Sequence, residues 1–299
     1  MRFRVICLII FNMFVVSASA QALEICGDLR QGELFYVRGN PMENIDIFNG
    51  LRKEVYFSDK YGFTLIALHR DAPKNIKMTV YSGNDAGTSY ELQIEPAKWD
   101  IQRIEGVKKH HVTPDKSAEA EILREQKEVH MALAGVKDGG KPSSVPDTYR
   151  FWSEGFILPV EGRISGHFGH QRIFNGVPKS PHSGTDIAAP EGTPVKASAG
   201  GKVVLSGKDY FYTGNMVIID HGHQLKTIYA HLKDITVEVG DDVKQGDIIG
   251  HVGKTGRATG PHLHWGASLG NVRFRPHSLL NLTDKQCQYI TGKYMGNEK

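Results

Sequence analysis

Residues 255–270 read TGRATGPHLHWGASLG, a Gly-Pro turn followed by an apolar stretch that contains two histidines. Residues i and i+2 of a β-strand point to the same face, so His262 and His264 would share one face while Leu263 points into the core. Two neighbouring imidazoles can divide their tasks, since one can bind a metal ion while the other stays free to transfer protons. This stretch therefore predicts a strand that carries a functional site.

The residues around this stretch, 151–299, predict an all-β, barrel-like sandwich. Glycine stands at most joints between apolar or alternating segments, where it permits tight corners and bulges. The predicted strands lie within residues 193–207, 216–222, 224–232, 235–253 and 262–269.

Residues 21–106 predict a smaller β-sandwich. Six short segments rich in β-branched and aromatic residues are separated by turn residues such as Asn49-Gly50, with no helical pattern between them. The segments are 32–39, 44–50, 54–58, 63–69, 76–83 and 89–96. No catalytic cluster is evident here, and Trp99 is interpreted as a core residue rather than a platform for a ligand.

Residues 107–150 predict a helix and a flexible linker between the two domains. Thr113 and Pro114 suit the N-cap and first position of the helix, and Gly135 suits its end. The Gly/Pro/Ser-rich residues 137–147 follow as the linker. We therefore expect the helix to be a connector whose charges are solvated, within a fold that is mainly β.

Residues 1–20 have the pattern of a secretory signal, with a basic start, a short apolar run and small residues at its end. Cleavage after Ala20 or Ala22 would leave no segment able to span a membrane, and an uncleaved N-terminal anchor is the alternative. We expect a periplasmic or secreted protein. The formal net charge is +3 with the signal and about +1 without Arg2 and Arg4, so nothing indicates a nucleic-acid partner.

Three cysteines are present, and Cys7 would leave with the signal. In an oxidising compartment Cys26 and Cys287 could form a disulfide between the two ends of the mature chain. Two free thiols are the alternative, because sequence does not give the distance between them.

Ten of the 14 histidines follow residue 160. His182 and Asp186 form an H-x-x-x-D pair, and with His264 they would make a three-ligand zinc site with its fourth position open, as in catalytic sites. His231 lies in another predicted strand and could transfer protons beside the metal. The plainer alternative is that these histidines are ordinary core or surface residues.

Residues 158–278 resemble the LytM/lysostaphin-type zinc endopeptidases that cut peptidoglycan cross-links. The resemblance is carried by GRISGHFG, HSGTDIAAPEGTPVKASAGGKVV, GNMVIIDHG, TIYAHL and VGDDVKQGDIIGHVGKTGRATGPHLHW. The segments FGHQRIFNGVPKSPHSGTDIA and DYFYTGN, and WDIQRIEG at residues 99–106, are similar to a secreted bacterial subgroup with a β-rich N-terminal domain.

The resemblance implies roles for five residues. His182, Asp186 and His264 match the ligands of one zinc ion, and His231 and His262 match two catalytic histidines. The segment VEVGDDVKQGDIIG also resembles the hammerhead of lipoyl and biotinyl carrier domains, which indicates the fold, since no lysine stands at the hairpin tip as a carrier would need.

Several other polar and aromatic residues could lie near the predicted zinc site. Asn175 lies in the loop where some relatives place an asparagine that blocks the zinc in a latent form. Arg172 and Tyr212 are candidates for the lining of the substrate groove. His167 and His170 could lie either in the groove or on an exposed loop. We expect turn or surface positions for His221, His223 and His251, and residues 281–283 form a glycosylation sequon that could occur by chance.

The predicted function is a zinc-dependent peptidoglycan endopeptidase that hydrolyses stem-peptide cross-links of the D-Ala–diaminopimelate type. A glycyl-glycine endopeptidase and, more remotely, an elastin-like protease are alternatives within the same chemistry. A wall-binding or hydrolase-activating regulatory protein is the non-enzymatic alternative. Peptidoglycan is the expected partner, and the N-terminal domain could bind the wall, bind a partner or cover the groove.

Overall fold

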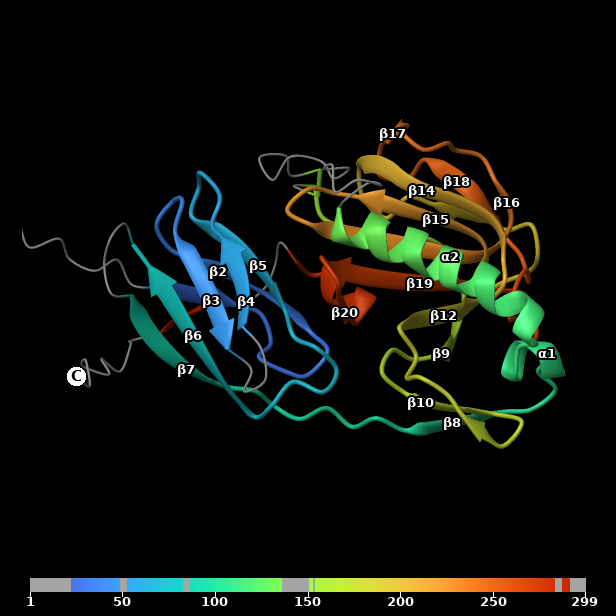
Figure 1. Cartoon of the computed structure of the whole chain (residues 1–299). Helices are drawn as coiled ribbons and strands as arrows, with labels where there is room; N and C mark the ends of the chain where they lie inside the picture. Colours follow the sequence, from blue (N-terminus) through green and yellow to red (C-terminus); the bar gives the residue numbers. More distant parts are fainter. Residues whose placement is uncertain are drawn as a thin grey trace, which may run out of the picture.

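The computed structural model describes residues 23–48, 53–82, 87–135, 151–152, 154–282 and 287–290. The predicted signal at residues 1–20 and the predicted linker at residues 137–147 lie outside these ranges. The described chain is mainly β, as predicted, and its strands form one large sheet, two four-stranded sheets and one three-stranded sheet (Figure 1). None of its helices is both long and apolar enough to cross a membrane.

The N-terminal part consists of two four-stranded sheets around a shared apolar core that includes Phe35, Ile47, Ile66 and Met78. Each of the six predicted segments overlaps one observed strand, with starts that differ by at most two residues. These strands are β2 (Leu34–Arg38), β3 (Asn44–Phe48), β4 (Lys53–Phe57), β5 (Phe63–Ala67), β6 (Asn75–Tyr81) and β7 (Thr88–Gln93). In β6 buried and less buried residues alternate, as expected for a strand with one face on the core.

The last described strand of the chain belongs to this N-terminal part. β21 (Cys287–Ile290) pairs antiparallel with β1 (Leu23–Cys26), and the register sets Cys287 opposite Cys26. Cys26 is disulfide-bonded, which excludes the alternative of a free thiol at this position. Strand β21 falls within the predicted domain 151–299, but it pairs with a strand of the N-terminal part.

The C-terminal part is a strongly bent sheet with the order β17-β14-β15-β16-β19-β12-β9, to which β13, β18 and β20 are attached. Its core includes the fully buried Tyr229, Leu263 and Trp265. The strands are β9 (Arg163–Gly166), β12 (Gly184–Ala188), β13 (Pro194–Lys196), β14 (Gly201–Tyr210), β15 (Gly214–Asp220), β16 (Leu225–Ile235), β17 (Asp242–Val243), β18 (Ile248–Val252), β19 (His262–Leu269) and β20 (Val272–Phe274), followed by the short helix η1 (Pro276–Leu279).

The helical region differs from the prediction at its start. A short helix α1 (Lys109–Val112) ends before Thr113, and α2 (Lys116–Ala134) begins after Asp115 rather than at Thr113 and Pro114. Thr113 is extended, because a residue that precedes proline is disfavoured in the helical conformation. The predicted end is confirmed, since Gly135 caps the helix with a φ of 70°.

Helix α2 is also more than a connector. It lies across the large sheet (Figure 1), and Ala132 and Leu133 pack on Met216, Ile218 and other apolar residues of that sheet. Its charges are not all solvated, because Glu125 is buried and accepts a hydrogen bond from the backbone N–H of Phe211. The solvated face that we expected therefore covers only part of the helix.

A segment of the predicted N-terminal domain reaches the C-terminal part. β8 (Ile101–Ile104) pairs parallel with β10 (Gln171–Phe174), which also pairs with β11 (Val177–Pro178), and Figure 1 shows this three-stranded sheet beside β9 and β12. The predicted boundary at residue 106 thus cuts between β8 and α1, whereas the strand pairing places β8 with the C-terminal part.

Polar and aromatic contacts also join the two parts. The buried Glu33 forms an ion pair with Arg275, and the Arg70 side chain donates a hydrogen bond to the carbonyl of Gly169 at 2.6 Å. Trp99 lies edge-on to Phe168, with 5.9 Å between the ring centroids. Trp99 is therefore partly buried and packs between the two parts, rather than lying in a core as interpreted.

Candidate metal centre

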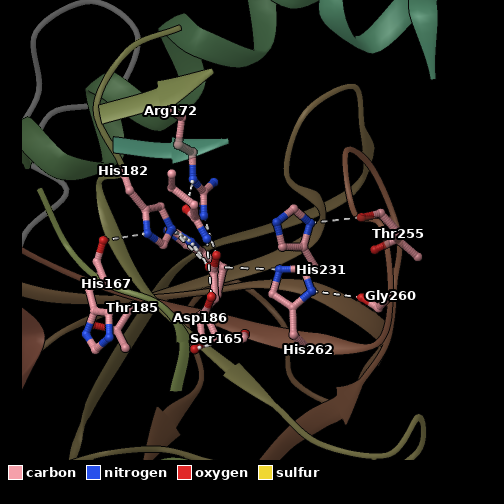
Figure 2. Close-up of polar contacts among 12 residues, drawn as sticks. Ser165, His167, Arg172, His182, Thr185, Asp186, His231, Thr255, Gly260 and His262 are labelled. Carbon is pink, nitrogen blue, oxygen red and sulfur yellow. Dashed lines mark hydrogen bonds and ion pairs between the residues drawn. The ribbon is translucent and has the colours of Figure 1, made fainter. Parts of the chain in front are cut away.

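Three buried side chains of the C-terminal part converge on one point. His182 Nε2, Asp186 Oδ1 and His264 Nδ1 lie within 3.0 Å of one another. The three residues are at most 9% exposed. Figure 2 shows the imidazole of His182 and the carboxylate of Asp186 directed toward this point.

The strand register explains why residues so far apart in sequence meet. β12 and β19 pair antiparallel with Asp186 directly opposite His264, so their side chains are neighbours on one face of the sheet. His182 lies just before β12 and reaches the same face from the loop, where its backbone N–H donates to the carbonyl of His170. Within β19, Leu263 is fully buried on the other face, which confirms the predicted alternation.

The three donor atoms fit a divalent metal such as zinc. Imidazole nitrogen and carboxylate oxygen are zinc ligands, and tetrahedral bonds of about 2.0–2.1 Å imply donor separations of roughly 3.3 Å. The separations found here are 2.9–3.0 Å. The described residues contain one group of three or more His, Cys, Asp or Glu side chains close enough to hold a metal ion, and it is this group.

The protonation states also suit a metal site. Burial lowers the pKa of His182 to about 4 and also lowers the pKa of His264, so both imidazoles are neutral near pH 7. Burial alone would raise the pKa of Asp186, but the charges and hydrogen bonds of the two histidines hold it well below its ordinary value. The Nδ1–H of His182 donates to the carbonyl of His167 at 3.0 Å, which leaves Nε2 as the nitrogen able to bind a metal.

Two further imidazoles lie beside the three ligating atoms. The ring centroids of His231 and His262 are 4.7 Å apart, and His262 Nε2 is 3.8 Å from Asp186 Oδ1. In each ring Nδ1 faces a carbonyl oxygen, that of Thr255 at 2.9 Å for His231 and that of Gly260 at 2.8 Å for His262. A carbonyl only accepts, so Nδ1 carries the hydrogen and Nε2 is left as a proton acceptor in both rings.

The backbone of His231 is held in an uncommon conformation. Its φ is 62°, and the register between β15 and β16 shifts at this point, as in a β-bulge. The backbone N–H of His231 donates to the carbonyl of Thr213 at 2.9 Å. Gly214, which follows Thr213, also has a positive φ, and a Cβ there would lie 2.2 Å from the Thr255 hydroxyl oxygen. Glycine at this position therefore lets the loop at Thr255 approach His231.

Two arginines lie on the side of the site near the three-stranded sheet. Arg172 donates a hydrogen bond to Asp186 Oδ2 (Figure 2). It donates another to Gln102 Oε1 at 3.2 Å. Gln102 is in β8, so a residue of the predicted N-terminal domain supports a side chain at the centre. The guanidinium of Arg257 lies between the rings of Phe174 and Tyr212. Arg172 and Tyr212 are thus beside the centre, as considered from the sequence.

The other histidines lie outside the donor set. His167 and His170 contact the site through their backbone carbonyls, which bind His182. The expectation of a turn or surface position is wrong for His221, which is fully buried with Gly200 and Thr227 as hydrogen-bond partners. The same expectation holds for His223, which is buried but lies in a turn, and for His251, which is partly exposed and forms an ion pair with Asp234.

Asn175 does not lie among the donor atoms. It occupies the turn between β10 and β11 with a φ of 47°, and its side-chain amide bonds the backbone N–H and carbonyl of Val107. The structure therefore provides no contact between Asn175 and the three ligating atoms.

Sequence reasoning missed the groups that orient the imidazoles, namely the carbonyls of His167, Thr255 and Gly260. Backbone carbonyls have no signal of their own in a sequence. The glycines at 256 and 260 and Pro261 mark an irregular loop before β19, which was the available hint.

Fold and site together define a β-protein with a buried His-Asp-His cluster and two imidazoles, those of His231 and His262, beside it. Residues 180–276 match peptidase family M23, so the chain carries a domain of this family, as the resemblance implied.

Two curated relatives share this region. The peptidoglycan DD-endopeptidase ShyA of Vibrio cholerae is 46% identical over 110 residues, which is 36% of this chain and 25% of the relative. The DD-carboxypeptidase/endopeptidase Mpg of Neisseria meningitidis is 46% identical over 120 residues, which is 40% of this chain and 27% of the relative. The matches thus span about a quarter of the length of these relatives.

One solved structure covers most of the chain. A putative peptidase M23 from Pseudomonas aeruginosa is 27% identical, with a TM-score of 0.61 over 85% of this chain and 96% of that one. The similarity to this peptidase thus extends well beyond residues 180–276.

Proposed function

We propose that the chain is a zinc-dependent peptidoglycan endopeptidase that hydrolyses stem-peptide cross-links outside the cytoplasmic membrane. The observation that carries the proposal is the juxtaposition of three convergent donor atoms with two imidazoles whose Nε2 atoms are proton acceptors. The names of the Vibrio cholerae and Neisseria meningitidis relatives support a DD-endopeptidase, and hence the D-Ala–diaminopimelate bond. The signal-like residues 1–20 support export.

In this proposal His182, Asp186 and His264 hold one zinc ion. A zinc ion in such a site polarises a carbonyl group and lowers the pKa of a bound water to about 7. The hydrogen bond from Arg172 to Asp186 Oδ2 leaves Oδ1 as the oxygen that faces the two ligand histidines. Arg172 therefore orients the carboxylate ligand.

His231 and His262 move protons. In each ring Nδ1 contacts a backbone carbonyl, so in the neutral form Nδ1 carries the hydrogen and Nε2 can accept a proton. The ring that accepts a proton from the attacking water becomes an imidazolium, and it can return that proton to the leaving amine. The fixed Nδ1 contact keeps the ring oriented throughout, which is the role of the orienting group in general acid–base catalysis.

The experiment uses the purified chain and isolated diaminopimelate-type sacculi, with products resolved by mass spectrometry. We expect cross-linked dimers to give monomers, this activity to be lost with a chelator and to return with zinc. His231→Ala should keep zinc and lose about 10²–10⁴-fold in rate, whereas Asp186→Ala should lose both zinc and activity. Full activity in either variant would contradict the proposal.

Cleavage of glycine-bridged wall in place of diaminopimelate-type wall would favour the glycyl-glycine alternative. If neither wall is cleaved, while the chain still binds sacculi, the non-enzymatic alternative would replace the endopeptidase.

A further inference from the structure

Arg257 stands at the rim of the proposed catalytic centre. It is two residues from Thr255, whose carbonyl holds the imidazole of His231 at 2.9 Å. Its own backbone N–H donates to the carbonyl of Tyr212 at 2.9 Å. Tyr212 directly precedes Thr213, which binds the backbone of His231. The same two loops therefore fix His231 and the base of the Arg257 side chain.

The guanidinium of Arg257 lies against two aromatic rings. Its central carbon is 4.8 Å from the ring centroid of Phe174 and 4.4 Å from that of Tyr212. Phe174 is itself buried against Val107 and Val112, so one of the two rings is rigid. Stacking uses the faces of a guanidinium and leaves its N–H donors at the edge, where a carboxylate can be bound by two parallel hydrogen bonds.

These edge donors are not used within the described part of the protein. The Arg257 guanidinium makes ring contacts there, but no hydrogen bond and no ion pair. Asp186 is bound by Arg172, His182 and His264 and is therefore already engaged. Burial lowers the pKa of Arg257 only to about 10, so it is charged near neutral pH. A partly desolvated cation without an anionic partner is costly, unless a bound ligand supplies the anion.

The chemistry of the cross-link offers such an anion. In a D-Ala–diaminopimelate bond, the carbon attached to the scissile amide nitrogen also carries a free carboxylate. A glycine bridge has no carboxylate next to an internal scissile bond. The D-Ala–diaminopimelate cross-link and the glycine bridge therefore differ in a free carboxylate, which is the group that arginine binds best.

We propose that Arg257 is a specificity residue that binds the free carboxylate of the diaminopimelate on the amine side of the scissile bond. The inference rests on the proposed function and deepens it, because it assigns a residue to the choice of substrate. The contacts of Arg257 with Phe174 and Tyr212 fit this role, because they orient the guanidinium before the substrate binds and leave its N–H groups available.

The test compares two substrates that share the same scissile bond. One is a cross-linked muropeptide dimer with the free diaminopimelate carboxylate, and the other is the same dimer with that carboxylate converted to an amide. The variants are Arg257→Gln, which removes the charge, and Arg257→Lys, which keeps the charge without the planar fork. Lys254→Gln is the matched control, because it removes one charge from the same loop at an exposed side chain that contacts Glu191.

We expect Arg257→Gln to raise KM for the carboxylate dimer about 10- to 100-fold with a nearly unchanged kcat, as for a lost charge-assisted hydrogen bond. KM for the amidated dimer should hardly change, Arg257→Lys should recover part of the loss, and Lys254→Gln should match the wild type. Equal losses on both dimers would overturn the proposal in favour of a structural role in the His231 loop. Unchanged constants on both dimers would overturn it as well.

Failure of the proposed function can be told from failure of this inference. If the zinc-loaded wild type cleaves neither dimer, the endopeptidase proposal fails. Titration calorimetry with the same two dimers then tests Arg257 independently. Tighter binding of the carboxylate dimer that Arg257→Gln abolishes would support the carboxylate site, and equal binding of both dimers by the wild type would overturn it.

Discussion

Gly184 is a position where a single methyl group should disrupt the metal centre. It begins β12, two residues before Asp186, and pairs with Gly266 of β19. A Cβ at residue 184 would lie 2.5 Å from the carbonyl oxygen of Trp265 and 2.7 Å from His264 Nε2. Gly184→Ala therefore pushes a methyl group against both the backbone and the ring of a proposed zinc ligand.

The size of the effect follows from these distances. Ordinary van der Waals contact begins near 3.4 Å, so the His264 ring must retreat by roughly 0.7 Å if the backbone holds its place. Metal–ligand distances tolerate only about 0.2 Å. We expect zinc affinity to fall at least tenfold, as when the support of a ligand is lost, and stability to fall by about 1–3 kcal/mol from overpacking.

The assay is zinc binding by competition with a chromogenic chelator, together with thermal unfolding. Gly260→Ala is the matched control, because no heavy atom lies within 4 Å of a Cβ at that position, although its carbonyl holds His262. The control should bind zinc like the wild type. A Gly184→Ala protein with wild-type zinc affinity would refute the packing argument.

Three further predictions concern metal, pH and the disulfide. Zinc at about 100 times its Kd should stabilise the wild type by about 2.7 kcal/mol in thermal unfolding, and Asp186→Ala should show no such gain; an equal gain in both would place the metal elsewhere. Burial lowers the pKa of His221 from 6.5 to about 4, so its contribution to stability is present above pH 6.5 and is lost as the pH falls toward 4, by about 1.4 kcal/mol per pH unit. His221→Gln should flatten that slope in urea unfolding at pH 7, 6 and 5, and an identical slope would contradict the assignment. Cys26→Ser should cost about 2–5 kcal/mol and make the melting temperature insensitive to reductant, whereas continued sensitivity would show that another bond is responsible.

The sequence by itself determined the features that depend on local spacing. Short segments rich in β-branched and aromatic residues, separated by turn residues, identified the six N-terminal strands. Alternation with period two set His262 and His264 on one face with Leu263 in the core. The end of α2 at Gly135 followed from the tolerance of glycine for positive φ. The spacing of His182 and Asp186, with the doublet in β19, indicated a metal site, and the resemblance of the segments around them indicated the family.

Only the tertiary structure decided which distant segments meet. The pairing of β8 with β10 and of β21 with β1 joins segments that no local periodicity connects. The burial of His221 and the packing of α2 likewise depend on what lies across the sheet. Backbone carbonyls orient His231 and His262, and two aromatic rings hold Arg257, because loops remote in sequence are brought together by strand register. The residues that can bind a metal or transfer a proton are recognisable in the sequence, whereas the contacts that orient them exist only in the folded chain.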